Sequence, residues 1–138
     1  MENSKAAFNI IASSIQVLAA EHGFETWGNF PHEVEKLKKL IVKSNAKGVL
    51  LLSGDRHISE FSKTAVAKLS FPLIDFTSSG LTYAYKGFTN ETNKYRVQNV
   101  VSEISFGVLK FDFDTHKITM QMRGKDNKLL QELFQVYP

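Results

Sequence analysis

The chain has 138 residues, of which 43% are hydrophobic and 22% charged, the balance of an ordinary globular protein rather than a disordered one. Cysteine is absent, which excludes disulfides, thiolate metal sites and cysteine nucleophiles together. The formal charge is +3 and the lysines are scattered along the sequence, so binding to nucleic acid is not expected.

No apolar run approaches the roughly 20 residues that cross a bilayer, so no membrane contact is expected. The first five residues are polar and lack the basic-then-apolar pattern of a signal peptide. As written, the chain would stay in the cytosol, whereas a longer parent protein could be exported. The localisation is therefore left open, and residues 1–138 are expected to form one domain.

The first elements alternate between strand and helix patterns. An apolar run at 7–13 is typical of a buried strand, and a polar loop is expected at 14–30. Pro31 suits the first turn of a helix, in which apolar residues recur at helical spacing from Val34 to Ile41.

The middle of the chain repeats this alternation. The continuous apolar run at 48–52 predicts a central strand, residues 58–69 predict a helix, and 71–77 predict another buried strand. A strand–helix–strand–helix–strand series predicts an α/β layer.

The last third predicts a different arrangement. A long polar loop is expected at 78–102, and loops of this length in compact domains usually carry function or are mobile. Alternating runs at 104–113, at 118–122 and up to Tyr137 predict late antiparallel strands. The fold class is therefore α/β with a mixed sheet.

The string Ser53-Gly-Asp-Arg-His57 follows the most strand-like run in the chain. Ligands of open α/β sheets bind beyond the carboxyl ends of the strands. Asp55 and His57 are two residues apart, so both can point into one cleft, and a carboxylate with an imidazole suits manganese, iron or zinc. The alternative is a polar loop in which Asp55 caps a helix that begins near Ile58.

The sequence SGDRHISE at 53–60 resembles the last metal-binding block of the calcineurin-like metallophosphoesterases, in the form seen in the alkaline phosphatase D branch. Further segments match in the same order: Trp27 followed by Phe30-Pro-His-Glu33, the segment 72–82 (PLIDFTSSGLT), and the late hairpin. The resemblance implies the C-terminal portion of a four-layer αββα sandwich.

The resemblance also implies a function. The parent would be a two-metal phosphoesterase that hydrolyses phosphomonoesters or phosphodiesters with a metal-bound hydroxide. His57 would be the catalytic and metal-binding histidine, and Asp55 a second metal ligand. The metals would be divalent or trivalent ions of the Fe, Mn, Zn or Ca class. The earlier ligand blocks of the superfamily are missing here, so the chain alone is expected to be inactive and to lack a stable two-metal site.

Other residues are weaker site candidates. His22 lies where the superfamily often has another metal-site histidine, and Trp27 is either a substrate-stacking or a core residue. Asn93 and Arg96 lie in the long polar loop, where they could grip a phosphate or serve only the loop.

Two further readings compete with that of the hydrolase fragment. In the first, the chain is a non-catalytic module that pairs with itself or with another chain, because half of a sandwich leaves one apolar sheet face bare. Self-association is therefore expected. In the second, Ser53 or Ser59 acts as a nucleophile with His57, but there is no Gly-x-Ser-x-Gly elbow to support it.

Overall fold

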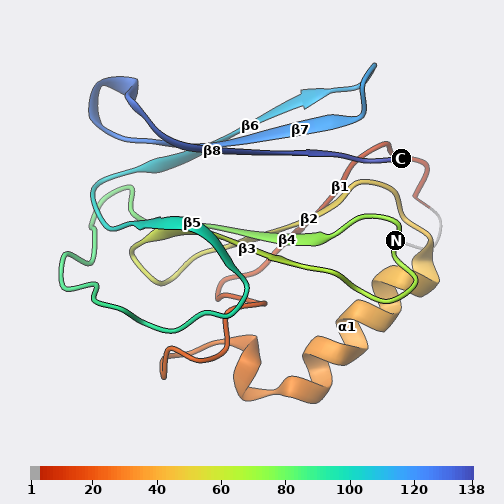
Figure 1. The fold of residues 1–138 in the computed structure, drawn as a ribbon, viewed down its shortest axis with the longest axis horizontal. Coiled ribbons are helices and arrows are strands. Elements are labelled where there is room, and N and C mark those ends of the chain that lie inside the picture. The colour runs from red at the N-terminus through yellow and green to blue at the C-terminus, as the bar shows by residue number, and fades with distance from the viewer. Residues whose placement is uncertain (1–3) are drawn as a thin grey trace.

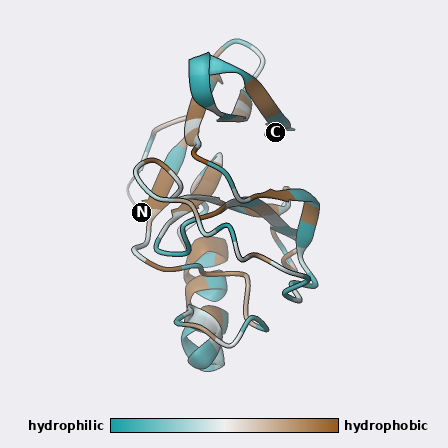
Figure 2. Cartoon of the chain, turned by 90° about the vertical axis from the view of Figure 1, so that its left-hand side faces the viewer, coloured by the Kyte–Doolittle hydropathy of each residue, from teal (hydrophilic) through white to brown (hydrophobic). Residues whose placement is uncertain are grey.

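The computed structural model describes residues 4–138 as two β-sheets and one α-helix stacked in layers (Figure 1). The larger sheet lies in the middle, with α1 on one face and the smaller sheet on the other. Figure 2, turned by 90°, shows the same three layers one above another. Within the described residues, no helix has both the length and the apolarity to cross a membrane.

The larger sheet has five strands in the order β1-β2-β4-β3-β5 and is mixed. The sequence predicts a mixed sheet from its late strands, but these form a separate sheet, and the antiparallel pairing here comes from β3 and β5. Strands β1, β2 and β4 are parallel, whereas β3 is antiparallel to both β4 and β5. Their bounds are β1 Asn9–Ala12, β2 Val49–Ser53, β3 Ser59–Thr64, β4 Leu73–Ser78 and β5 Arg96–Val101.

The helix α1 (Pro31–Ser44) confirms the prediction made from Pro31 and the apolar spacing. Pro31 occupies the first turn, where its missing N–H costs nothing. Ile41 is buried against the sheet, and Leu37 packs beside the same core. The helix ends at Asn45, whose left-handed backbone (φ 52°) suits asparagine. A short 3-10 turn, η1 (Trp27–Asn29), precedes it.

The helix expected at 58–69 is wrong. Residues Ser59–Thr64 form β3, and an exposed turn follows. Phe61 faces Phe76 across the sheet at a ring distance of 4.7 Å, while Glu60 and Ser62 are buried on the opposite face. Because both faces of β3 are covered, polar and apolar side chains are equally buried and the strand period is not visible in the sequence. Asp55 therefore has no helix to cap.

The long loop expected at 78–102 is partly wrong, because residues Arg96–Val101 form the edge strand β5. This strand lies at the edge of the sheet, where Gln98 and Asn99 are exposed, and its register shifts between Ser59 and Phe61 of β3. Gln98 adopts a positive φ of 65° at this irregularity.

The smaller sheet is antiparallel in the order β6-β7-β8 and confirms the late strands. Ile118, Met120 and Met122 are fully buried against the larger sheet, each contributing about 1.5–3 kcal/mol by burial. The bounds are β6 Phe106–Asp112, β7 Lys117–Arg123, the 3-10 turn η2 Lys125–Asn127, and β8 Leu129–Val136.

Candidate functional site

The loop after β2 carries the two residues that the sequence singles out for metal binding. Asp55 and His57 both have left-handed backbone conformations, with φ of 70° and 53°, and both are exposed. Arg56 between them is buried. Aspartate and histidine tolerate this conformation better than most residues, so the loop can present both side chains to solvent while it turns Arg56 inward.

A pocket of about 210 Å³ opens at this loop and is lined by Phe24, Asp55, Arg56, His57 and Tyr85. Tyr83 packs edge-on against the His57 ring at 5.0 Å, and the Tyr85 amide donates to the His57 carbonyl at 2.8 Å. The segment that follows β4 therefore folds back over His57 and fixes one wall of the pocket.

Arg56 forms a buried ion pair instead of facing the pocket as a free cation. Its Nη2 donates to Glu91 Oε2 at 2.6 Å, its Nη1 donates to Gln16 Oε1 at 3.4 Å, and its guanidinium lies 4.5 Å from the centre of the Phe24 ring. Glu91 neutralises the charge, so the arginine ties the Asp55–His57 loop to the segment before β5.

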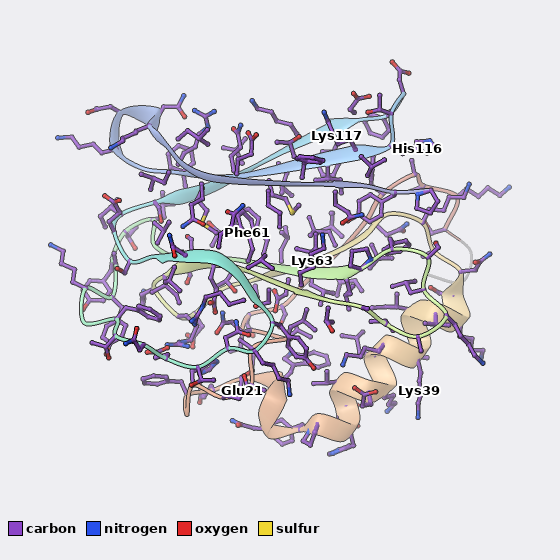
Figure 3. The ribbon with its side chains drawn as sticks, in the orientation of Figure 1. Glu21, Lys39, Phe61, Lys63, His116 and Lys117 are labelled. Atoms are coloured by element: carbon purple, nitrogen blue, oxygen red, sulfur yellow. The ribbon has the colours of Figure 1, made fainter. Side chains whose placement is uncertain are left out.

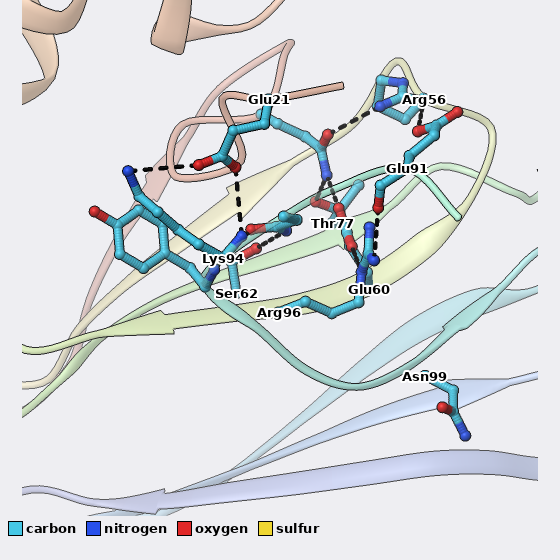
Figure 4. A network of polar contacts seen from close by, with 12 residues as sticks. Glu21, Arg56, Glu60, Ser62, Thr77, Glu91, Lys94, Arg96 and Asn99 are labelled. Carbon is cyan, nitrogen blue, oxygen red and sulfur yellow. Dashed lines mark hydrogen bonds and ion pairs between the residues drawn. The ribbon is translucent and has the colours of Figure 1, made fainter. Parts of the chain in front are cut away.

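The ion pair belongs to a larger network on the same sheet face (Figure 4). Glu60 accepts from Arg96 Nε and from Gln16 Nε2, both at 2.6 Å, and only 1% of Glu60 is exposed. Arg96 Nη1 also donates to the Glu91 carbonyl at 2.8 Å. Two arginines, two glutamates and Gln16 thus join β3, the loop after β1, the loop after β2 and the segment before β5.

Asp75 in β4 is a second buried carboxylate beneath the site. Its Oδ2 accepts from the amides of Val17 and Leu18 at 2.8 and 3.0 Å, and its Oδ1 accepts from the Ser53 hydroxyl at 2.7 Å. Burial raises the pKa of Asp75, an effect that these hydrogen bonds oppose. The carboxylate holds the loop after β1 against the sheet.

A solved structure of PhoD, alkaline phosphatase D, is similar to this fold. The match covers 98% of this chain with a TM-score of 0.61 and 17% sequence identity. The chain spans 29% of the PhoD chain. Neither the family models nor the curated proteins compared with the sequence gave a match. At this identity the likeness is one of fold, and the mixed two-sheet architecture is consistent with part of a PhoD-like fold.

His22 lies in the loop after β1, close enough to Arg56 for that charge to affect it. Burial chiefly, and the Arg56 charge next, lower the pKa of His22, so the ring is neutral at neutral pH. Its Nδ1 accepts from the Phe24 amide at 3.2 Å, which places the proton on Nε2. That Nε2 is buried and has no hydrogen-bond partner within residues 4–138. A role for His22 in metal binding stays a prediction.

The three other candidate residues each form a hydrogen bond or ion pair within the fold. Trp27 packs partly buried at the start of α1 and donates to Ser13 Oγ at 3.1 Å. Asn93 donates to Ser62 Oγ at 2.8 Å, and Arg96 pairs with Glu60. Roles in substrate binding stay predictions for all three. By contrast, His116 is exposed in the β6–β7 turn at the far side of the molecule (Figure 3).

Gln16, Glu60, Asp75 and Glu91 contribute to the site but were not predicted from the sequence. These residues lie far apart along the chain and meet only because β2, β4 and β3 are neighbours in the sheet. A signal was nevertheless present for Asp75, since a carboxylate inside the apolar run at 71–77 needs a buried partner.

The residues present do not make a complete metal centre. Within residues 4–138, no three His, Cys, Asp or Glu side chains lie close enough together to hold an ion. Asp55 and His57 supply two donors of suitable chemistry, which is fewer than the usual ligand set of a stable site.

Proposed function

We propose that this chain is the C-terminal portion of a metal-dependent phosphoesterase related to alkaline phosphatase D. The observation that carries the proposal is the Gly-Asp-Arg-His block at the carboxyl end of β2, in a fold similar to that of PhoD. In the parent, Asp55 and His57 would be metal ligands, and the phosphoester would bind in the pocket beside Tyr85.

The remaining ligands would come from another part of the parent protein. Asp55 and His57 are exposed and accessible, but two donors hold an ion only weakly. We therefore propose that the chain alone does not hydrolyse phosphomonoesters or phosphodiesters. The size of the native polypeptide, measured by immunoblot in its source cells, tests whether such a parent exists, since a fragment predicts a band much longer than 138 residues.

Mn²⁺ is expected to broaden NMR signals near the Asp55–His57 loop even when it binds weakly. In proton NMR spectra, added Mn²⁺ should broaden the signals of His57 and of Tyr83, whose ring is 5.0 Å away, before those of the other residues. Asp55→Ala and His57→Ala should abolish this selectivity, whereas His116→Ala, a change at an exposed histidine in a remote turn, should leave it unchanged. Equal broadening of His57 and His116 would contradict the ligand assignment.

The second candidate function is a non-catalytic module that associates with itself, and one observation favours it. The outer face of the smaller sheet has no helix over it among the described residues (Figure 1). Phe134 and Val136 lie on this face and are 60% and 50% exposed. A four-layer αββα sandwich would cover this face with a fourth layer, and exposed apolar sheet faces of this kind favour association.

Self-association of the isolated chain is expected to depend on this face. Phe134→Glu should shift the weight-average mass in analytical ultracentrifugation toward the monomer, because a buried carboxylate opposes contact between two such faces. Leu40→Glu is the matched control, since Leu40 is exposed to a similar degree on α1. A wild-type chain that stays monomeric at high concentration would argue against an association module.

A further inference from the structure

A groove lies between the second half of α1 and the turn that joins β3 to β4. It consists of two adjoining depressions of about 430 and 320 Å³, which share Val42 and Lys68 in their walls. The turn precedes β4 and the His57 loop follows β2, and these strands are parallel. The groove and the His57 pocket therefore lie at opposite ends of the larger sheet.

The groove gathers lysines that are far apart in the sequence. Lys38 and Lys39 come from α1, Lys68 from the turn, and Lys47 from the loop before β2. Among the described residues, Glu35 is the acidic side chain in these walls, and it pairs with Lys38 at 2.8 Å. Pro138, the last residue of the chain, adds a carboxylate to the smaller depression.

Three of these lysines form no ion pair with the described residues, although the charge of Lys39 also acts on Glu35. Within residues 4–138, the side chains of Lys39, Lys47 and Lys68 take part in no ion pair. The carboxyl end of α1 adds only about half a negative charge nearby. The groove is therefore positively charged, although the lysines look scattered along the chain.

The floor of the groove selects among anionic ligands. Val42, Ala65, Val66 and Ala67 form an apolar surface between the lysines. No aromatic ring lines the larger depression, and Phe71 in the smaller one is only 6% exposed, so bases of a single-stranded nucleic acid would have little stacking surface there. A peptide segment that combines carboxylates with aliphatic side chains matches both the charge and the floor.

We infer that this groove is a docking site for an acidic, aliphatic peptide segment of a partner protein. The lysines would attract the carboxylates and fix their register, and the floor would take the aliphatic side chains. The inference is independent of the proposed phosphoesterase function, because it uses neither Asp55 nor His57. It makes the end of the sheet opposite to the pocket an interaction surface.

The test measures binding of a fluorescein-labelled synthetic peptide of alternating glutamate and leucine pairs to the full chain by fluorescence anisotropy. The double variant Lys39→Glu with Lys68→Glu should weaken the affinity at least about tenfold, because it reverses two charges that face the peptide. The matched control is Lys110→Glu with Lys125→Glu, which makes the same change in net charge at exposed positions of the other sheet. That control should bind within about twofold of the wild-type chain.

The other outcomes overturn the inference. Equal weakening by both double variants would mean attraction by net charge alone. Absence of binding at low ionic strength would mean that the groove does not recognise this class of peptide. Tighter binding of a single-stranded oligonucleotide, lost in the groove variant, would assign the lysines to nucleic acid instead. Circular dichroism spectra and thermal melts of both variants confirm that each is folded.

Discussion

Replacing Asp75 with alanine is expected to lower the free energy of unfolding by about 2–5 kcal/mol. The substitution removes the acceptor of the Val17 and Leu18 amides and of the Ser53 hydroxyl, and Asp75 is only 1% exposed. Two backbone N–H groups would then be buried without partners. Urea denaturation at neutral pH measures the change, and a loss below about 1 kcal/mol would mean that water replaces the carboxylate.

Asp75→Asn is the informative control, because asparagine resembles the protonated acid. Its carbonyl oxygen can accept from the two amides, and its amide can donate to Ser53, which in turn contacts Thr77 at 2.8 Å. We therefore expect this variant to be at least as stable as the wild-type chain at neutral pH. A large loss of stability would instead show that the site requires the negative charge.

The wild-type chain and the Asp75→Asn variant should also differ in pH dependence. Burial raises the pKa of Asp75 above its ordinary value of 3.8, so above that pH the folded chain holds a proton that the unfolded chain has released. The part of the stability that comes from holding this proton is then full below 3.8 and is lost as the pH rises through the folded-state pKa. Since the substituted asparagine does not titrate, the stability advantage of the variant should grow with pH over this window.

Much of the fold follows from local pattern. Pro31 and the apolar spacing locate α1, and the continuous run at 48–52 locates the central strand. Strand β3 could not be found in this way, because Ser59, Glu60 and Ser62 are as deeply buried as Phe61. Over a few residues, a helix and a strand that is covered on both faces can show the same order of polar and apolar residues. Which of the two forms depends on the neighbouring strands, which come from elsewhere in the chain.

The candidate site also contains residues that a local motif predicts and residues that only the fold brings together. Asp55 and His57 could be singled out because their motif is local and follows a recognisable strand. The network beneath them could not, because Glu60 meets Arg96 across 36 positions and Gln16 meets Glu60 across 44. Such polar groups become partners only once the strand order is known, and the order β2-β4-β3 departs from the order along the chain.

Replacing Glu60 with alanine is expected to cost about 3–5 kcal/mol of stability, because it leaves the mostly buried Arg96 guanidinium without its carboxylate. The effect should reach the pocket. Arg96 also holds the Glu91 carbonyl, and Glu91 pairs with Arg56 in the loop of Asp55 and His57. Amide hydrogen exchange in segment 79–95 should therefore quicken more than exchange in the smaller sheet.

A double-mutant cycle separates the ion pair from general damage to the core. If Glu60 and Arg96 stabilise each other, Glu60→Leu and Arg96→Met should each lower the stability when made alone. The double variant should recover most of that loss, since removing both charges leaves neither one buried alone. The exposed pair Glu33–Lys36, 3.5 Å apart on α1, is the matched control, and Lys36→Ala should change stability by less than about 0.5 kcal/mol. Additive losses at Glu60 and Arg96 would show that the 2.6 Å contact between them contributes no interaction energy. The segment over His57 would then be held by its other hydrogen bonds.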